Sequence, residues 1–238
     1  MARSKSPVFQ FKKFSVAHDR CGMKIGTDGV LLGAWVNIES TTKILDVGTG
    51  SGVIALMLAQ RTNGKAHIDA IEIALPDAQQ AKENVSQSPW PNQVTIHPTS
   101  LQEYHTDHRY DLIVSNPPFF HSSFSPKRER ISSRHTQSLS FEDILKFSAP
   151  LLQPDGRLAV VLPTEEGERF QELARLAGLF PIRKMRLFSK PGKPQERWLL
   201  EFSSHPSETI HEQLYIHDVA GDWGEDYRSL TKDFYLHF

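Results

Sequence analysis

The stretch KILDVGTGSGVIALMLAQ at residues 43–60 decides the fold. Residues 43–47 form a short apolar run, which is typical of a strand buried on both faces, and residues 53–60 suit the helix that follows. Between them, closely spaced glycines let the backbone turn sharply and approach a ligand that a Cβ would exclude. The stretch therefore predicts one strand–loop–helix unit of a parallel α/β sheet.

The rest of the chain repeats this alternation of apolar runs and helical segments, as a doubly wound sheet does. Residues 182–188 and 198–202 are joined by the Pro- and Gly-containing loop 189–196, so these two strands form a hairpin. We therefore expect an α/β fold with a mostly parallel seven-stranded sheet that ends in an antiparallel hairpin. The remaining strands are expected at 67–73, 94–97, 111–115 and 157–162, and the remaining helices at 77–87, 141–152 and 165–177.

The 238 residues are interpreted as a single domain. Its core spans residues 41–203, preceded by an N-terminal extension, 1–40, and followed by an irregular appendage, 204–238.

Composition excludes several classes of protein. Hydrophobic residues make up 39% of the chain, but no stretch approaches the roughly 20 apolar residues that cross a bilayer. The start has no apolar signal region, so we expect a cytoplasmic protein without a membrane partner. A lone cysteine, Cys21, excludes an internal disulfide and a cysteine-based zinc cage, and the 11 histidines have no metal-ligand spacing. We expect no metal.

The net charge of −1 hides an uneven distribution. Residues 1–24 and 180–197 each contain six basic residues against one acidic residue, whereas residues 199–238 contain eight acidic residues against two basic ones. Such asymmetry can create a basic face that attracts phosphate, or it can be solvated surface alone.

The glycine loop differs from a dinucleotide-binding loop. Its glycines stand at 48, 50 and 52, and Val53 occupies the place of the third glycine in G-x-G-x-x-G. Asp46 would repel a pyrophosphate, but it suits a cofactor with ammonium and sulfonium cations. Glu72 follows about 20 residues later, where a carboxylate accepts hydrogen bonds from ribose hydroxyls.

The strand 111–115 runs directly into Asn116, Pro117, Pro118 and Phe119. The two prolines stiffen the loop and remove two backbone donors. They would do the same in an ordinary turn that merely ends a strand. At the carboxyl end of a strand beside the cofactor, however, the Asn116 side-chain oxygen and the Pro117 carbonyl can accept the two N–H groups of an amino nitrogen. Phe119 can stack on a base.

Together these features resemble the class I S-adenosylmethionine methyltransferases, which have a Rossmann-like fold. The Asn-Pro-Pro-Phe tetrapeptide is similar to the motif of members that methylate adenine N6, cytosine N4, guanine N2 or a glutamine amide. The resemblance implies S-adenosylmethionine as cofactor, with Lys24–Asp28 near its methionine end and Ser100 and Leu101 beside its adenine. The implied cofactor-binding residues are Lys24, Thr27, Asp28, Asp46, Gly48, Thr49, Gly50, Gly52, Glu72, Ile73, Ser100, Leu101 and Asn116.

A more specific likeness covers nearly the whole chain. It rests on FQFK at 9–12, CGMKIGTDGVLLGAW at 21–35, SRHT at 133–136, SLSF at 138–141 and FYL at 234–236. These segments resemble the bacterial tRNA1(Val) (adenine-N6)-methyltransferase family. The likeness implies an enzyme that methylates the adenine next to the valine anticodon, with tRNA as its partner. We expect a monomer. A glutamine-N5 methyltransferase of a release factor and an rRNA amino-group methyltransferase remain alternatives.

Basic residues near the Asn-Pro-Pro-Phe loop are candidates for binding RNA. Cations mixed with aromatic side chains can hold phosphates and stack a flipped base, although a soluble loop without function has the same composition. The candidates are Lys127, Arg128, Arg130, Arg134, Lys190 and Lys193.

Overall fold

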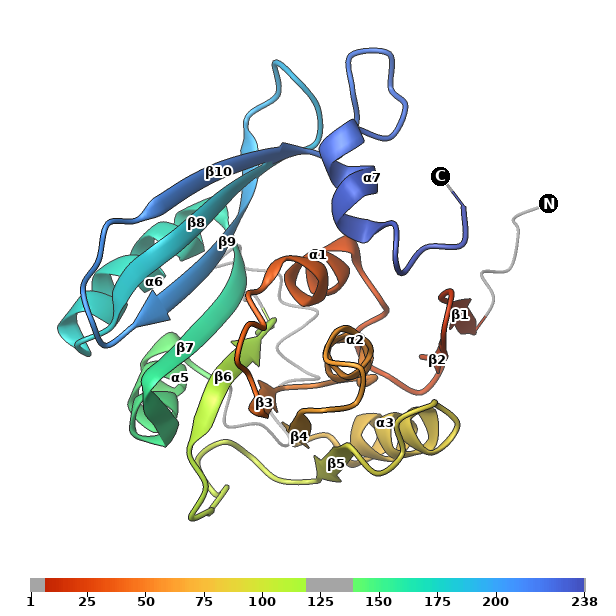
Figure 1. The fold of residues 1–238 in the computed structure, drawn as a ribbon, viewed down its shortest axis with the longest axis vertical. Helices are drawn as coiled ribbons and strands as arrows, with labels where there is room; N and C mark the ends of the chain where they lie inside the picture. The colour runs from red at the N-terminus through yellow and green to blue at the C-terminus, as the bar shows by residue number, and fades with distance from the viewer. Residues whose placement is uncertain (1–6, 119–138, 238) are drawn as a thin grey trace, which may run out of the picture.

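The computed structural model describes residues 7–118 and 139–237 (Figure 1). Eight strands form one sheet in the order β10-β8-β9-β7-β6-β3-β4-β5. Their bounds are β3 Lys43–Val47, β4 His67–Ile71, β5 Val94–His97, β6 Tyr110–Ser115, β7 Leu152–Pro163, β8 Phe180–Phe188, β9 Gln195–Ser203 and β10 Ile210–Tyr215.

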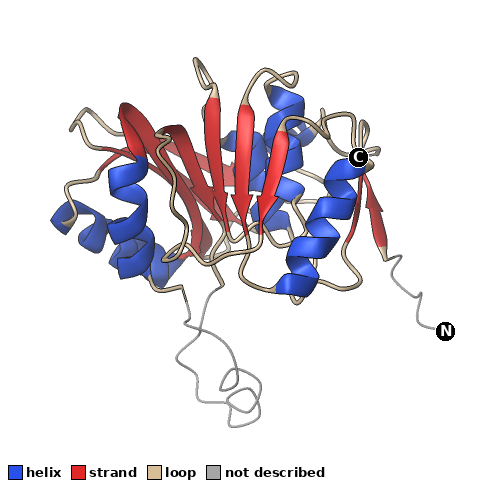
Figure 2. Cartoon of the chain, turned by 90° about the horizontal axis from the view of Figure 1, so that it is seen from below, coloured by secondary structure: helices blue, strands red, loops and turns tan. Residues whose placement is uncertain are grey.

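The sheet lies between two groups of helices (Figure 2). Residues alternate across each strand, so that Ile44 faces one core while Leu45 faces the other. The first core contains α1 Thr27–Trp35, α2 Val53–Arg61 and α3 Leu75–Ser86, and the second contains α5 Phe141–Ser148 and α6 Thr164–Leu176. Covering both faces explains why the central strands are apolar throughout.

The expected fold class is confirmed, and the strand count is corrected. Strands β3 to β7 are parallel, and β7, β9 and β8 pair in antiparallel fashion, as the predicted hairpin requires. The eighth strand, β10, lies in the segment expected to be irregular and pairs in parallel with β8. Its sequence IHEQLY has no apolar run, because β10 is an edge strand that is mostly open to solvent.

Some boundaries also differ from the prediction. Helix α5 ends at Ser148, and a 3-10 turn at Ala149–Leu151 takes the place of its last turn, because Pro150 cannot continue the helix. Strand β7 therefore begins at Leu152, five residues earlier than expected.

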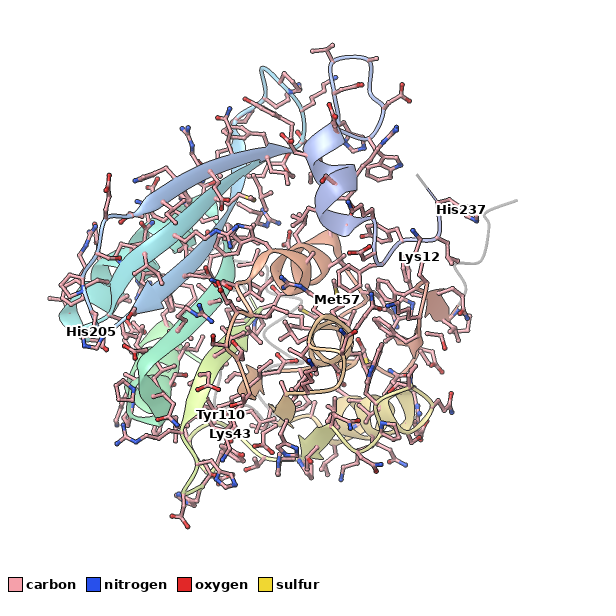
Figure 3. The ribbon with its side chains drawn as sticks, in the orientation of Figure 1. Lys12, Lys43, Met57, Tyr110, His205 and His237 are labelled. Atoms are coloured by element: carbon pink, nitrogen blue, oxygen red, sulfur yellow. The ribbon has the colours of Figure 1, made fainter. Side chains whose placement is uncertain are left out.

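The two ends of the chain pack against each other. Strands β1 Val8–Gln10 and β2 Ser15–Ala17 form a hairpin, and Phe11, which directly follows β1, forms a bridge with Tyr235. The backbone N–H of Lys12 donates to Phe234 O at 2.8 Å, and its Nζ donates to Lys232 O at 2.6 Å. Lys12 therefore lies beside the segment that follows α7 Glu225–Thr231 (Figure 3).

Helix α1 was not among the helices predicted from the sequence. It is buried from Gly29 to Trp35 and packs directly on α2. A Cβ at Gly33 would lie 3.0 Å from the sulfur of Met57, a fully buried residue of α2 (Figure 3). The missing side chain thus permits the close approach of the two helices.

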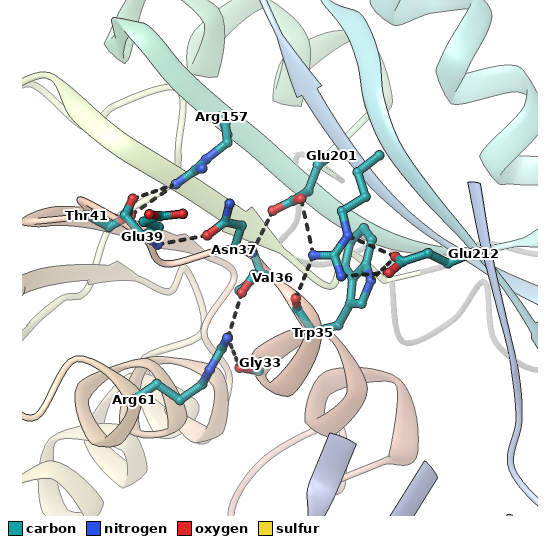
Figure 4. Close-up of polar contacts among 11 residues, drawn as sticks. Gly33, Trp35, Val36, Asn37, Glu39, Thr41, Arg61, Arg157, Glu201 and Glu212 are labelled. Carbon is teal, nitrogen blue, oxygen red and sulfur yellow. Dashed lines mark hydrogen bonds and ion pairs between the residues drawn. The ribbon is translucent and has the colours of Figure 1, made fainter. Parts of the chain in front are cut away.

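Arginine side chains hold the C-terminal end of α1 (Figure 4). Arg61 donates to Gly33 O at 3.0 Å and Val36 O at 2.7 Å, and Arg183 donates to Trp35 O at 3.0 Å. Cations there complement the partial negative charge of a helix C-terminus. Burial lowers the pKa of Arg61 to about 10.

Two glutamates fix the Arg183 guanidinium in turn. Glu212 accepts from its Nε at 2.8 Å and from its Nη2 at 3.0 Å, and Glu201 Oε2 lies 3.7 Å from Nη1. The guanidinium carbon also lies 4.4 Å from the Trp35 ring centre. This network ties α1 to β8, β9 and β10.

Candidate active site

The glycine loop lies at the carboxyl ends of β3 and β4. The backbone N–H groups of Gly48 and Thr49 donate to Ile71 O at 2.9 and 3.0 Å, so the loop is fastened to the end of β4. Gly48 and Gly50 have φ angles of +72° and +55°, and a Cβ on either would meet no described atom within 4 Å. The loop therefore borders open space that a side chain would fill, as a cradle for a ligand does.

Asp46 is the most deeply buried acid of this loop, with a relative exposure of 0%. Its Oδ2 accepts from Thr49 Oγ1 at 2.6 Å, whereas Oδ1 is buried without a hydrogen-bond partner among the described residues. Burial raises the pKa of Asp46 to about 7, against the opposing effect of the Thr49 hydroxyl and the Ala55 backbone N–H. A neighbouring cation would offset the cost of burying this carboxylate.

Glu72, which immediately follows β4, faces the same loop. Its Oε2 accepts from the Gly50 N–H and its Oε1 from the Ala74 N–H, both at 2.9 Å. Burial raises the pKa of this carboxyl group as well. Beside it, the side chain of Ile73 is 45% exposed and offers apolar surface. The acid expected at the end of the second strand thus lies against the glycine loop.

Ser100 and Leu101 follow β5, whose last residue, His97, accepts a hydrogen bond from the Glu72 N–H at 3.1 Å. Both Ser100 and Leu101 are buried. The Ser100 hydroxyl donates to the carboxylate of Glu103 at 3.2 Å. Glu103 was not predicted as a site residue, although an acid three residues after a serine is a familiar turn pattern.

Asn116 extends from the end of β6, the strand next to β3. The preceding hydroxyl, Ser115 Oγ, donates to Val47 O at 2.9 Å and fastens this loop to β3. Asn116 Oδ1 is buried without a hydrogen-bond partner among the described residues. Pro117 is buried and Pro118 is exposed, while Phe119 lies outside the described residues. An unpaired, buried amide oxygen beside the cradle is available to a ligand.

Three predicted residues lie at the start of α1. Lys24 Nζ donates to His18 O at 2.7 Å and Asp19 O at 3.2 Å, so it braces its own loop. Thr27 is exposed, and Asp28 Oδ2 accepts from Arg197 Nε at 2.9 Å. Arg197, on β9, was not predicted as a site residue. Its partner lies 169 residues away in the sequence, so no local pattern signals the pair.

The basic candidates divide into two groups. Lys190 and Lys193 are exposed in the turn between β8 and β9. The other four, Lys127, Arg128, Arg130 and Arg134, lie outside the described residues.

Two further properties of residues 7–118 and 139–237 concern metals and membranes. No group of three or more His, Cys, Asp or Glu side chains there is arranged to hold a metal ion. None of the helices found there is long and apolar enough to span a bilayer.

The fold and the loops at the strand ends define a class I methyltransferase. Residues 22–180 match the model of the methyltransferase small domain family. A structure described as a predicted O-methyltransferase from Agrobacterium tumefaciens superposes with a TM-score of 0.68 at 16% identity, over 87% of this chain and 96% of that one. A ribosomal protein L11 methylase from Lactobacillus delbrueckii has a TM-score of 0.52 at 20% identity, over 74% and 76% of the two chains.

Curated relatives are much closer in sequence. One from Parabacteroides distasonis is 46% identical over 235 residues, which is 97% of this chain and 98% of the relative. One from Bacteroides thetaiotaomicron is 42% identical over 98% of both chains. Each is named tRNA1(Val) (adenine(37)-N6)-methyltransferase. The chain belongs to this family, which confirms the likeness seen in the sequence.

The burial of Asp46 predicts how stability depends on pH. Below about pH 4 the carboxyl group is protonated in both folded and unfolded chains; between about pH 4 and 7 it ionises only in the unfolded chain. The ligand-free wild type should therefore lose stability relative to Asp46→Asn as the pH rises through this window, by up to about 4 kcal/mol. Urea denaturation of both proteins at a series of pH values measures this difference in stability. A difference that does not change with pH would contradict the raised pKa of Asp46.

Proposed function

We propose that this protein transfers a methyl group from S-adenosylmethionine to the N6 amino group of an adenine in the anticodon loop of valine tRNA. The observation that supports it best is the position of Asn116, whose amide oxygen has no hydrogen-bond partner among residues 7–118 and 139–237 and lies one strand away from the glycine cradle. The relatives' name specifies the base, adenine 37 of tRNA1(Val).

The residues of the cradle fit the cofactor. S-adenosylmethionine supplies a methyl group bound to a sulfonium cation. Glu72 would accept hydrogen bonds from the ribose hydroxyls, while the buried Asp46 carboxylate favours the cationic end. Gly48, Gly50 and Gly52 would contribute backbone without obstructing side chains, and Thr49 would contribute backbone while its hydroxyl is bonded to Asp46. Ile73 and Leu101 would flank the adenine with apolar surface. Thr27 lies on the turn of α1 next to Asn116 and would border the methionine end.

Asn116 and Pro117 would orient the acceptor. An adenine amino nitrogen is a poor nucleophile, because its lone pair is delocalised into the ring. Asn116 Oδ1 and the Pro117 carbonyl would each accept one N–H group, which holds the nitrogen in place with its lone pair directed at the methyl carbon. As the new N–C bond forms, the methyl–sulfur bond would break and leave a neutral thioether, and the nitrogen would lose one proton to solvent. The rate gain comes from orientation, so no general base is required.

The basic side chains suit an RNA substrate. Phosphates of the RNA would be bound by Lys190 and Lys193, and by four residues near the catalytic loop in sequence, Lys127, Arg128, Arg130 and Arg134. Phe119 would stack on the extruded adenine. We further propose that the chain acts in the cytoplasm, as a monomer with a single methyltransferase domain and without a metal.

The open space at Gly50 gives a test of cofactor binding. Gly50→Ala places a methyl group in the cradle, whereas Gly178→Ala strains the same left-handed backbone region after α6, far along the chain from this loop. Both variants should lose stability by about 1 kcal/mol, but Gly50→Ala alone should bind S-adenosylmethionine at least about tenfold more weakly. Isothermal titration calorimetry measures the affinity, and thermal denaturation measures the stability. Equal affinity of the two variants for S-adenosylmethionine would contradict binding of the cofactor at the glycine loop.

The acceptor is identified by following labelled methyl groups. The enzyme, S-adenosylmethionine and one acceptor are incubated together: tRNA1(Val), the same transcript with guanine at position 37, rRNA, or a release factor. We expect N6-methyladenosine in the first transcript and no label in the others. Asn116→Ala should lower kcat about 100-fold, whereas the exposed Asn92→Ala should behave as the wild type. Preferential labelling of rRNA or of a glutamine in the release factor would overturn the proposed function.

A further inference from the structure

The first turn of α1 packs against Asn116 in the catalytic loop. A Cβ built on Gly29 would lie 3.5 Å from Asn116 Nδ2 and 3.7 Å from a side-chain carbon of Ile54 in α2. Gly29 is itself buried, so the helix backbone lies directly against the asparagine amide. Because Asn116 Oδ1 has no hydrogen-bond partner in the described part of the chain, packing against this turn determines where that oxygen points.

This end of α1 lacks the usual means of fixation. Its N-cap residue, Gly26, provides no side-chain hydrogen bond, and the first backbone bond of the helix, Val30 N to Gly26 O, is long at 3.4 Å. An uncapped first turn frays more readily than a capped one. The other end of the helix, by contrast, is held by Arg61 and Arg183.

The ion pair between Asp28 and Arg197 supplies the missing attachment. Asp28 is the residue before Gly29, and its Oδ2 lies 2.9 Å from Arg197 Nε. Arg197 stands on β9 opposite Pro163, the last residue of β7, so it projects from the carboxyl edge of the sheet. The two side chains are 26% and 33% exposed, which limits screening by solvent. A carboxylate in the first turn also suits the helix dipole.

We propose that Arg197 is a positioning residue for methyl transfer: through Asp28 it holds the first turn of α1 against Asn116 and so fixes the acceptor oxygen that orients the amino group. This inference rests on the proposed function. It reassigns Asp28 from contact with the cofactor to support of the catalytic loop.

A double-mutant cycle tests the coupling. Arg197→Met and Asp28→Ala should each lower kcat for tRNA about tenfold, with the KM for tRNA and the affinity for S-adenosylmethionine changed less than about twofold. The combined variant should also lose about tenfold, because the second change removes a contact that is already broken. Arg197→Lys, which keeps the charge, should retain most of the wild-type kcat.

The matched control is Arg169→Met, which breaks an exposed pair with Glu142 on α5. It should leave kcat unchanged. Losses that multiply to about 100-fold in the combined variant, or a raised KM for tRNA at normal kcat, would overturn the inference in favour of independent roles or of a phosphate contact by Arg197.

Hydrogen exchange provides a readout that needs no turnover. In Arg197→Met the backbone N–H groups of residues 30 and 31, the first in α1 with an acceptor inside the helix, should exchange about tenfold faster than in the wild type, while those of residues 33–36 should be unaffected. Unchanged exchange at residues 30 and 31 would contradict the role of the ion pair. If the wild type made no N6-methyladenosine, the proposed function would be overturned. The exchange experiment would still show whether the ion pair holds the first turn of α1, because it does not depend on methyl transfer.

Discussion

The site depends on the burial of two carboxylates, Asp46 and Glu72, at the carboxyl ends of adjacent parallel strands. Neither acid forms an ion pair in the described structure; each is held by hydroxyl or backbone N–H donors. Burying a carboxylate without a cation is costly, and both pKa values are raised accordingly. Under the proposed function, a cationic ligand would offset that cost on binding. The open space at Gly48 and Gly50 leaves room for that ligand.

Helix α1 connects this cradle to the rest of the molecule. Its apolar body is buried against α2, its C-terminal carbonyls are held by Arg61 and Arg183, and its first turn lies against Asn116. Charged groups on β8, β9 and β10 reach α1 at both of its ends. We propose that the C-terminal strands, which lie far from the glycine loop in the sheet order, influence the position of Asn116 in this way.

Local patterns in the sequence were sufficient to predict the central strands of the fold and the position of the loops at their ends. The predicted strands 43–47 and 94–97 coincide with β3 and β5, because both are bounded by strong turn signals. The edge strand β10 was missed, since one-sided burial leaves little apolar signal in IHEQLY. The contact between Asp28 and Arg197 was also beyond prediction, because it depends on how β9 lies beside β7 and not on any pattern near either residue. Likewise, the sequence contains nothing that shows the Lys24 amine bonded to backbone carbonyls.

The most direct test of the account is the proton balance of S-adenosylmethionine binding, measured by isothermal titration calorimetry at pH 6 in buffers with different ionisation enthalpies. If the buried Asp46 carboxyl is protonated in the free protein and ionises beside the cation, the wild type should release roughly one proton on binding. Asp46→Asn should lack that release. An equal proton balance in the wild type and in Asp46→Asn would contradict the view that a buried, uncompensated carboxylate is what selects the cofactor.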